Sequence, residues 1–315
     1  MQTTRTVPVN GIELFVREQG SGPLVLLCHG WPELSYSWRH QIAALAAAGY
    51  RVVAPDMRGF GRSSAPAEVA AYSMFDLVGD MVALTAACGA HRAAIVGHDW
   101  GAAVAWHAAL FRPDLYCGVA GLSVPPPYRG RERPLDALHR QGIENFYWQY
   151  FQPPGLAEAE FERDPELTLR TILGGGFADA AALFVAPGQG LLRSPPPNQL
   201  LPDWLDEDDL AEFVAAYRAS GFRGGLNWYR NIDRNWELTA PWQDAQIRQP
   251  SLFIGGAQDA VVTSLLGGKR VAEMERVLPA LTRKLILPEA GHWIQQERPA
   301  EVNAALIEFL KRLEF

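Results

Sequence analysis

Short, almost wholly apolar segments recur along this chain and alternate with longer, helix-like stretches. A strand that is buried on both faces has such a continuous apolar sequence, because helices cover both sides of a parallel sheet. The alternation therefore predicts an α/β protein with a mostly parallel central sheet and helices on both faces. The apolar segments are residues 24–28, 51–54, 93–96, 119–122, 251–254 and 284–287, and the helix-like stretches lie near 36–48, 74–88, 100–111, 264–278 and 299–313.

Two parts of the chain depart from this alternation. Residues 4–18 have the pattern of two strands joined at Asn10-Gly11, a dipeptide that favours the tight turn of a hairpin. Between about 125 and 240 no buried strand-like segment occurs, and the segment is too long for a simple loop. We therefore predict a sheet-containing core formed by residues 1–127 and 240–315, with residues 128–239 inserted as a helical lid.

Composition and charge exclude several classes of protein. The chain has 315 residues, of which 48% are hydrophobic and 20% charged, and this balance is that of an ordinary globular protein. Because 28 basic residues face 35 acidic ones, the net charge is −7, and the absence of a basic cluster argues against a nucleic-acid partner. No apolar stretch approaches the roughly 18 residues that a membrane span requires.

Cysteine usage and the first residues bear on the cellular compartment. The three cysteines, Cys28, Cys88 and Cys117, lack metal-like spacing and are expected to be reduced thiols in the core. Residues 1–5 lack the apolar region of a signal peptide, so we expect a cytoplasmic protein. Both a monomer and a homodimer remain open.

The pentapeptide Gly-His-Asp-Trp-Gly at residues 97–101 follows one apolar segment and opens a helix-like stretch. Small residues on both sides of a central residue are typical of a nucleophile elbow, a sharp turn that exposes the central side chain. The central residue is Asp99, whose carboxylate is ionised at neutral pH and can attack saturated carbon to form an ester. The simpler alternative is that Asp99 only caps the helix, but capping does not require the two flanking glycines.

An ester on Asp99 must be hydrolysed, and this requires a base that activates water. His292 follows the last apolar segment, and its side chain has an unperturbed pKa near working pH. Asp259 follows the preceding segment and is the candidate that orients His292, so the order nucleophile, acid, histidine matches the triads of this elbow type. The alternatives are a hydrogen-bonded loop histidine and an aspartate that only forms a turn.

The backbone N–H groups of Trp31 and Trp100 are the candidate oxyanion hole. Trp31 lies in the sequence His-Gly-Trp-Pro at residues 29–32, which follows an apolar segment, and Trp100 follows Asp99 directly. Negative charge develops on the ester oxygen when water attacks, and backbone N–H groups at strand ends can receive it. Residues 56–63 contain glycines but fail the dinucleotide-binding pattern, so we assign them to structure.

Together these segments resemble the soluble epoxide hydrolases of the α/β-hydrolase superfamily, over nearly the whole chain. The resemblance implies conversion of an epoxide to a vicinal diol without a metal or organic cofactor. It also implies a helical lid that carries two catalytic tyrosines, Tyr150 and Tyr229, with Tyr147 as the alternative to Tyr150. The segments that carry the resemblance are residues 29–33, 97–101, Asp259, 291–293, and in the lid 147–155 and 222–231.

The tyrosines also fit the chemistry of the reaction. Opening an epoxide yields an alkoxide, which is a far stronger base than phenolate. A phenol with a pKa of about 10 can therefore polarise the ring oxygen and then release its proton to it. The alternative for either tyrosine is packing in the core with a hydrogen-bonded hydroxyl group.

Four aromatic side chains, Trp31, Trp100, Phe151 and Trp293, are expected around the nucleophile, either as an apolar substrate pocket or only as core. Such a pocket favours a small apolar epoxide. A haloalkane or haloacid dehalogenase is the nearest alternative function, because it shares the fold and the aspartate, but a halide leaves without a proton and needs no tyrosines. A non-enzymatic receptor with this fold is a further alternative.

Overall fold

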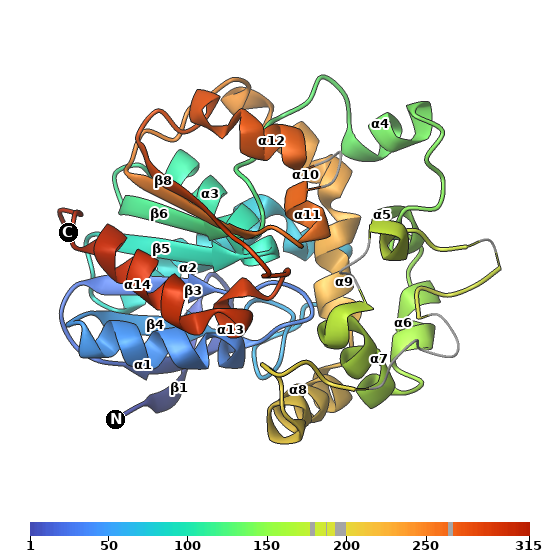
Figure 1. Ribbon diagram of the computed structural model, residues 1–315, viewed down its shortest axis with the longest axis horizontal. Helices are drawn as coiled ribbons and strands as arrows, with labels where there is room; N and C mark the ends of the chain where they lie inside the picture. Colours follow the sequence, from blue (N-terminus) through green and yellow to red (C-terminus); the bar gives the residue numbers. More distant parts are fainter. Residues whose placement is uncertain (177–179, 187, 193–199, 264–266) are drawn as a thin grey trace.

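The computed structural model describes residues 1–176, 180–186, 188–192, 200–263 and 267–315. In this part of the chain an eight-stranded sheet has the order β1-β2-β4-β3-β5-β6-β7-β8 (Figure 1). β1 pairs with β2, and β2 with β4, in antiparallel fashion, while all other neighbours are parallel. The predicted α/β class is therefore confirmed. The strands are Thr3–Val9 (β1), Ile12–Gln19 (β2), Leu24–Cys28 (β3), Arg51–Pro55 (β4), Ala93–His98 (β5), Tyr116–Leu122 (β6), Ser251–Gly256 (β7) and Leu281–Leu287 (β8).

The central sheet separates two hydrophobic clusters, because successive side chains of a strand point to opposite faces. On β5, Ala94 and Val96 belong to one cluster, and Ala93 and Ile95 belong to the other. Every residue of β3, β5, β6 and β7 is buried, as the continuous apolar segments predicted. For residues 284–287 this prediction is wrong, because β8 is an edge strand and is largely exposed. The covering helices are Arg39–Ala47 (α1) and Pro299–Leu310 (α14) on one face, and Met74–Ala87 (α2) and Trp100–Phe111 (α3) on the other (Figure 1).

A group of helices between β6 and β7 lies beside the sheet, on the side opposite the two chain termini (Figure 1). Within the described parts of residues 128–239 there is no strand beyond an isolated bridge between Phe146 and Phe184. The division at 127/128 and 239/240 stays a prediction. The helices are Pro134–Arg140 (α4), Tyr147–Tyr150 (α5), Leu156–Phe161 (α6), Pro165–Thr171 (α7), Glu207–Ser220 (α8), Arg223–Arg230 (α9) and Ile232–Leu238 (α10), with short turns at Ile172–Gly176 (η3) and Ala180–Leu183 (η4).

Local predictions near the two ends of the chain had different outcomes. The hairpin at Asn10-Gly11 is confirmed, and both residues have the positive φ angles that its tight turn requires. A continuous helix near 264–278 is wrong, although residues 264–266 lie outside the described residues. The following residues form two separate turns, Gly268–Ala272 (α12) and Met274–Arg276 (η6). Adjacent glycines at 267 and 268 disfavour a longer helix.

The remaining helical elements are short and connect the larger ones. The three cysteines are buried and free, as predicted. Across the described ranges, no helix has both the length and the apolar character that crossing a bilayer would require. The connecting elements are Ser35–Trp38 (η1), Val69–Tyr72 (η2), Ala240–Trp242 (η5), Ala260–Thr263 (α11) and Ile294–Glu297 (α13).

The lid helix α8 is bound to the core through Asp209. The Tyr36 hydroxyl donates to one carboxylate oxygen of Asp209 at 2.7 Å, and Arg39 forms an ion pair with the other oxygen at 2.7 Å. Arg39 also donates to the side chain of Gln296 at 2.7 Å. These contacts help to hold the lid close to the sheet edge at which the candidate site lies.

Candidate active site

The strand-to-helix turn predicted at residues 97–101 is present between β5 and α3. Asp99 has φ 52° and ψ −122°, a strained conformation for a residue with a side chain. A Cβ atom on Gly97 would lie 2.0 Å from the carbonyl oxygen of Gly101, so only glycine fits there. The sharp turn exposes the carboxylate of Asp99 at the carboxyl end of β5.

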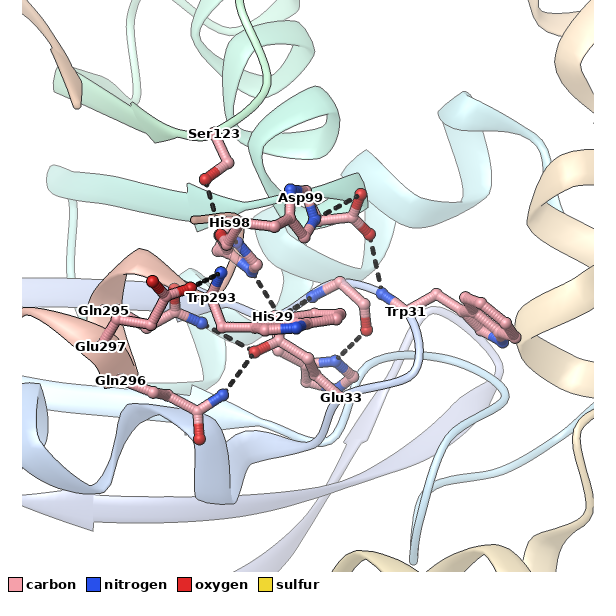
Figure 2. A network of polar contacts seen from close by, with 12 residues as sticks. His29, Trp31, Glu33, His98, Asp99, Ser123, Trp293, Gln295, Gln296 and Glu297 are labelled. Carbon is pink, nitrogen blue, oxygen red and sulfur yellow. Dashed lines mark hydrogen bonds and ion pairs between the residues drawn. The ribbon is translucent and has the colours of Figure 1, made fainter. Parts of the chain in front are cut away.

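The loop after β3 supplies a backbone donor to this carboxylate. The N–H group of Trp31 donates to Asp99 Oδ1 at 2.8 Å (Figure 2). Trp100 lies at the start of α3, where the first N–H groups have no acceptor within the helix. A donor role for Trp100 stays a prediction.

The candidate acid and base lie in the loops after β7 and β8, and the base links the acid to Asp99. Nδ1 of His292 is 2.9 Å from Asp259 Oδ2, and Nε2 of His292 is 3.6 Å from Asp99 Oδ2. Asp259 is buried, and its other oxygen accepts the N–H group of Val261 at 2.8 Å. The structure therefore brings together the three residues that the sequence predicted as nucleophile, acid and base.

The two carboxylates control the charge of the histidine between them. Burial by itself lowers the pKa of His292, but the nearby charges and hydrogen bonds of Asp259 and Asp99 raise this pKa well above its ordinary value. The imidazole is therefore charged while both carboxylates are ionised. Neutralising Asp99 removes one of the two groups that favour this charge.

We expect Asp99→Asn to lower the pKa of His292 by about one pH unit or more, because an opposite charge at this distance is lost. A pH titration of the His292 side-chain nitrogens by NMR measures this change. Asp208→Asn is a suitable control, because Asp208 is exposed at the start of α8. An equal pKa of His292 in the wild type and in Asp99→Asn would contradict the electrostatic coupling.

A second histidine, His98, lies directly before the nucleophile and is fully buried. Its Nδ1 is 2.5 Å from a carboxylate oxygen of Glu33 (Figure 2). Its Nε2 is 2.7 Å from the carbonyl oxygen of His292. Both partners are acceptors, so both ring nitrogens must donate and the ring is an imidazolium cation. The same carbonyl of His292 also accepts the Ser123 hydroxyl at 2.8 Å.

Glu33 is the buried anion that balances His98. Burial alone would raise its pKa, but the charge of His98 and its hydrogen bond lower the pKa of Glu33 to about 2. The carboxylate also accepts the N–H group of Gly30 at 3.1 Å and the side-chain amides of Gln295 and Gln296 at 2.7 and 3.2 Å (Figure 2). Neither Glu33 nor His98 was assigned a role from the sequence. Their positions beside Trp31 and Asp99 are the signal that could have identified them.

His29, in the same loop as Glu33, is neutral, unlike His98. Its Nε2 accepts the N–H group of Met57 at 2.8 Å, and its Nδ1 lies 2.8 Å from the carbonyl oxygen of Gly30. One nitrogen accepts and the other donates, so this ring is neutral. Burial is the main reason that the pKa of His29 is lowered, in agreement with this assignment.

A cavity of about 530 Å³ opens above Asp99, and its wall includes Trp100, Tyr147 and Tyr229. The ring centroids of Tyr147 and Tyr229 are 5.7 Å apart, and those of Tyr229 and Trp100 are 5.1 Å apart. Burial is the main reason that the pKa of both phenols is raised, and the negative charge of Asp99 raises it further. Both tyrosines therefore remain protonated beside the carboxylate.

Tyr150 is not part of this cavity, which corrects its predicted placement beside Tyr229. Its hydroxyl donates to Glu160 at 2.8 Å, and the same carboxylate accepts the N–H groups of Leu191 and Leu192. Tyr147 and Tyr150 both belong to the single turn α5, so spacing alone does not determine which of them faces Asp99. Packing determines it, because the Tyr147 ring contacts Tyr229 and the hydroxyl of Tyr150 is bound to Glu160.

Of the four aromatic residues predicted to line the pocket, Trp100 does so. Among the described residues of the cavity wall, Trp31, Phe151 and Trp293 are absent. Trp31 and Phe151 pack against each other and against Tyr229 behind the wall, and Trp293 packs against His98 and His292. These three side chains support the residues that face the cavity.

Comparison with known proteins agrees with this fold. A family model described as alpha/beta hydrolase fold matches residues 23–299. "Epoxide hydrolase A" of Mycobacterium tuberculosis is 47% identical and covers 99% of this chain and 98% of its own length. "Epoxide hydrolase" of Caballeronia sordidicola is 41% identical, over 98% of this chain and 93% of its own length.

Solved structures give the same result. The crystal structure of Epoxide Hydrolase A from Mycobacterium thermoresistibile has a TM-score of 0.94 and 47% identity, and all of both chains is covered. An epoxide hydrolase from an endophytic Streptomyces has the same TM-score of 0.94, over 98% of this chain and 95% of that chain. The chain belongs to the epoxide hydrolases of the α/β-hydrolase family. The resemblance found in the sequence motifs is thereby confirmed.

Proposed function

We propose that this epoxide hydrolase converts a small apolar epoxide into a vicinal diol through an ester on Asp99. The observation that supports this proposal is the arrangement of three groups around the carboxylate of Asp99. The carboxylate of Asp99 is bound by a backbone donor on one oxygen, faces the His292–Asp259 pair with the other, and lies below two protonated phenols.

In the first step an oxygen of Asp99 attacks a ring carbon, and the bond between this carbon and the ring oxygen breaks. Oδ1 is bound to the N–H group of Trp31, so Oδ2 forms the new bond and Oδ1 becomes the ester carbonyl oxygen. Tyr147 and Tyr229 hold the epoxide oxygen, and one of them gives its proton to the alkoxide. A halide would leave without a proton, so the pair of phenols favours an epoxide over a haloalkane.

In the second step His292 takes a proton from water, and the resulting hydroxide attacks the ester carbonyl. The N–H group of Trp31 stabilises the negative charge on Oδ1, with Trp100 as the second donor. Collapse of the resulting tetrahedral intermediate breaks the bond between the carbonyl carbon of Asp99 and the diol oxygen. This oxygen receives the proton from His292. The acid proton on Asp99 is then lost and restores the phenol, so that one epoxide and one water give one diol.

The charge of Asp99 also determines when His292 can act as a base. In the free enzyme the two carboxylates raise the pKa of His292, and the charged ring cannot accept a proton. Ester formation removes the charge of Asp99, so the pKa falls and the neutral base becomes available. Hydrolysis of the ester is therefore expected to slow as the pH falls below this lowered pKa.

A single turnover in heavy-oxygen water tests the proposal. With enzyme in excess over the epoxide, we expect the label in the carboxylate of Asp99 and not in the first diol released, because water attacks the ester carbonyl. Mass spectrometry of the peptide that contains residues 97–101 measures the label, and Asp99→Asn is the control. Label that enters the diol directly would contradict an ester intermediate.

A further inference from the structure

One face of α3 forms a wall of the substrate cavity beyond Asp99. Trp100, Ala103, His107 and Leu110 line the cavity, and their spacing of three and four residues places them in one stripe along the helix. An α-helix rises 1.5 Å per residue, so His107 lies about 10 Å along the helix from Trp100. The cavity therefore continues well past the nucleophile.

His107 presents a hydrogen-bond acceptor to this cavity. Its Nδ1 is 2.7 Å from the carbonyl oxygen of Ala103, so Nδ1 carries the proton and donates. Nε2, on the opposite edge of the ring, then has a lone pair, and it has no hydrogen-bond partner among the described residues. Burial lowers the pKa of His107 to about 4, so the ring is neutral under ordinary conditions.

The described wall of the cavity combines apolar side chains with polar and charged ones, among them Arg129, Asp244 and Arg270. Met74, Leu110 and Ile232 are apolar, and the side-chain oxygen of Asn235 accepts the N–H group of Met74 at 2.7 Å. A ligand that fills the cavity displaces water from Nε2, and a ligand that supplies a donor avoids the cost of leaving this acceptor unpaired. The position of Nε2 thus favours ligands that carry a donor at this depth in the cavity.

We propose that His107 is a specificity-determining residue that selects epoxides with a hydroxyl or N–H donor about 10 Å from the reactive ring. This inference rests on the proposed function of Asp99, because the reactive ring lies beside Asp99 and the distance is taken along α3 from its neighbour Trp100. An extended chain of about eight or nine single bonds spans this distance. The substrate class is therefore an apolar chain with an epoxide at one end and a neutral donor near the other.

A matched pair of substrates tests this proposal. One is a ten-carbon terminal epoxide with a hydroxyl on the far carbon, and the other is its methyl ether, which cannot donate. We expect wild-type kcat/KM to favour the alcohol by about 10-fold, because a lost donor leaves the acceptor unpaired. In His107→Phe the ratio should fall to about 1, and His107→Gln, which retains an acceptor oxygen, should recover part of it.

Leu110→Met is the control on the same face of α3, because it changes the wall without removing an acceptor, and its ratio should remain near that of the wild type. Equal kcat/KM values for the two substrates in the wild type would overturn the proposal. A preference that persists in His107→Phe would overturn it as well, and circular dichroism establishes that this variant is folded.

Failure of the proposed function gives a different result, namely that neither epoxide is converted. Binding then provides an independent measurement, with the ten-carbon triol and its methyl ether as probes and quenching of tryptophan fluorescence as the readout. Tighter binding of the triol in the wild type but not in His107→Phe supports the role of His107 even then. Equal affinities of both probes in the wild type would overturn it.

Discussion

Enzyme with the substitution His292→Gln is expected to accumulate a covalent ester when it is mixed with an aryl epoxide. The nucleophile, its Trp31 donor and both phenols remain, so the first step proceeds. Without a base to activate water, we expect steady-state turnover to fall by about 1,000-fold or more. Intact-mass spectrometry should show one added epoxide per chain, and peptide mapping should locate it within residues 97–101.

Two controls make this experiment specific. The double variant Asp99→Asn with His292→Gln should remain unmodified, because it lacks the nucleophile. His139→Gln should turn over like the wild type, because His139 is exposed on α4. The backbone carbonyl of His292, which binds His98 and Ser123, is retained in His292→Gln. Unmodified His292→Gln enzyme would therefore count against the two-step scheme and not against folding.

The double variant Tyr147→Phe with Tyr229→Phe is expected to slow formation of the ester by about 1,000-fold or more, because no phenol remains to protonate the alkoxide. Hydrolysis of an ester that has already formed does not require this proton, so its rate should change much less. Rapid-mixing fluorescence separates the two steps, since Trp100 lies in the cavity wall beside Tyr229. Slower hydrolysis with normal ester formation would refute the role of the phenols.

Tyr150→Phe is the matched control for this experiment. It removes a phenol from the same helical turn, but this hydroxyl binds Glu160 and not the cavity. We expect its rate of ester formation to stay within about twofold of the wild type. If Tyr150→Phe slows ester formation strongly and Tyr147→Phe does not, the assignment of Tyr147 is wrong and the prediction of Tyr150 from the sequence is preferable.

The elbow with Asp99, and the acid and base beside it, could be predicted from the sequence because they follow from general rules of local structure and sheet topology. A sharp turn such as that at Asp99 needs small neighbours, which are visible in the sequence as Gly97 and Gly101. The carboxyl ends of parallel strands meet at one edge of the sheet, so residues that follow β5, β7 and β8 come together whatever the details of packing. Asp259 and His292 were placed by this reasoning.

Other parts of the site depend on contacts between distant segments and could not be predicted. Which tyrosine of α5 faces Asp99 depends on Glu160, ten residues further along the chain, and on the position of Tyr229 in α9. The charge of His98 follows only when both of its partners are known, and one of them is a backbone carbonyl in the last loop of the sheet. No local pattern encodes these contacts.

The buried pair of Glu33 and His98 has a consequence for how the site is assembled. Trp31, the nucleophile and the base come from three different strand ends, yet all three are connected to this one pair. Gly30, next to Trp31, donates to Glu33, His98 directly precedes Asp99, and the carbonyl oxygen of His292 accepts from His98. The three loops thus form a rigid, preorganised frame, in which little rearrangement is needed when charge develops during the reaction. Loss of Glu33 would leave an unbalanced cation beneath the nucleophile, and the frame would lose its common anchor.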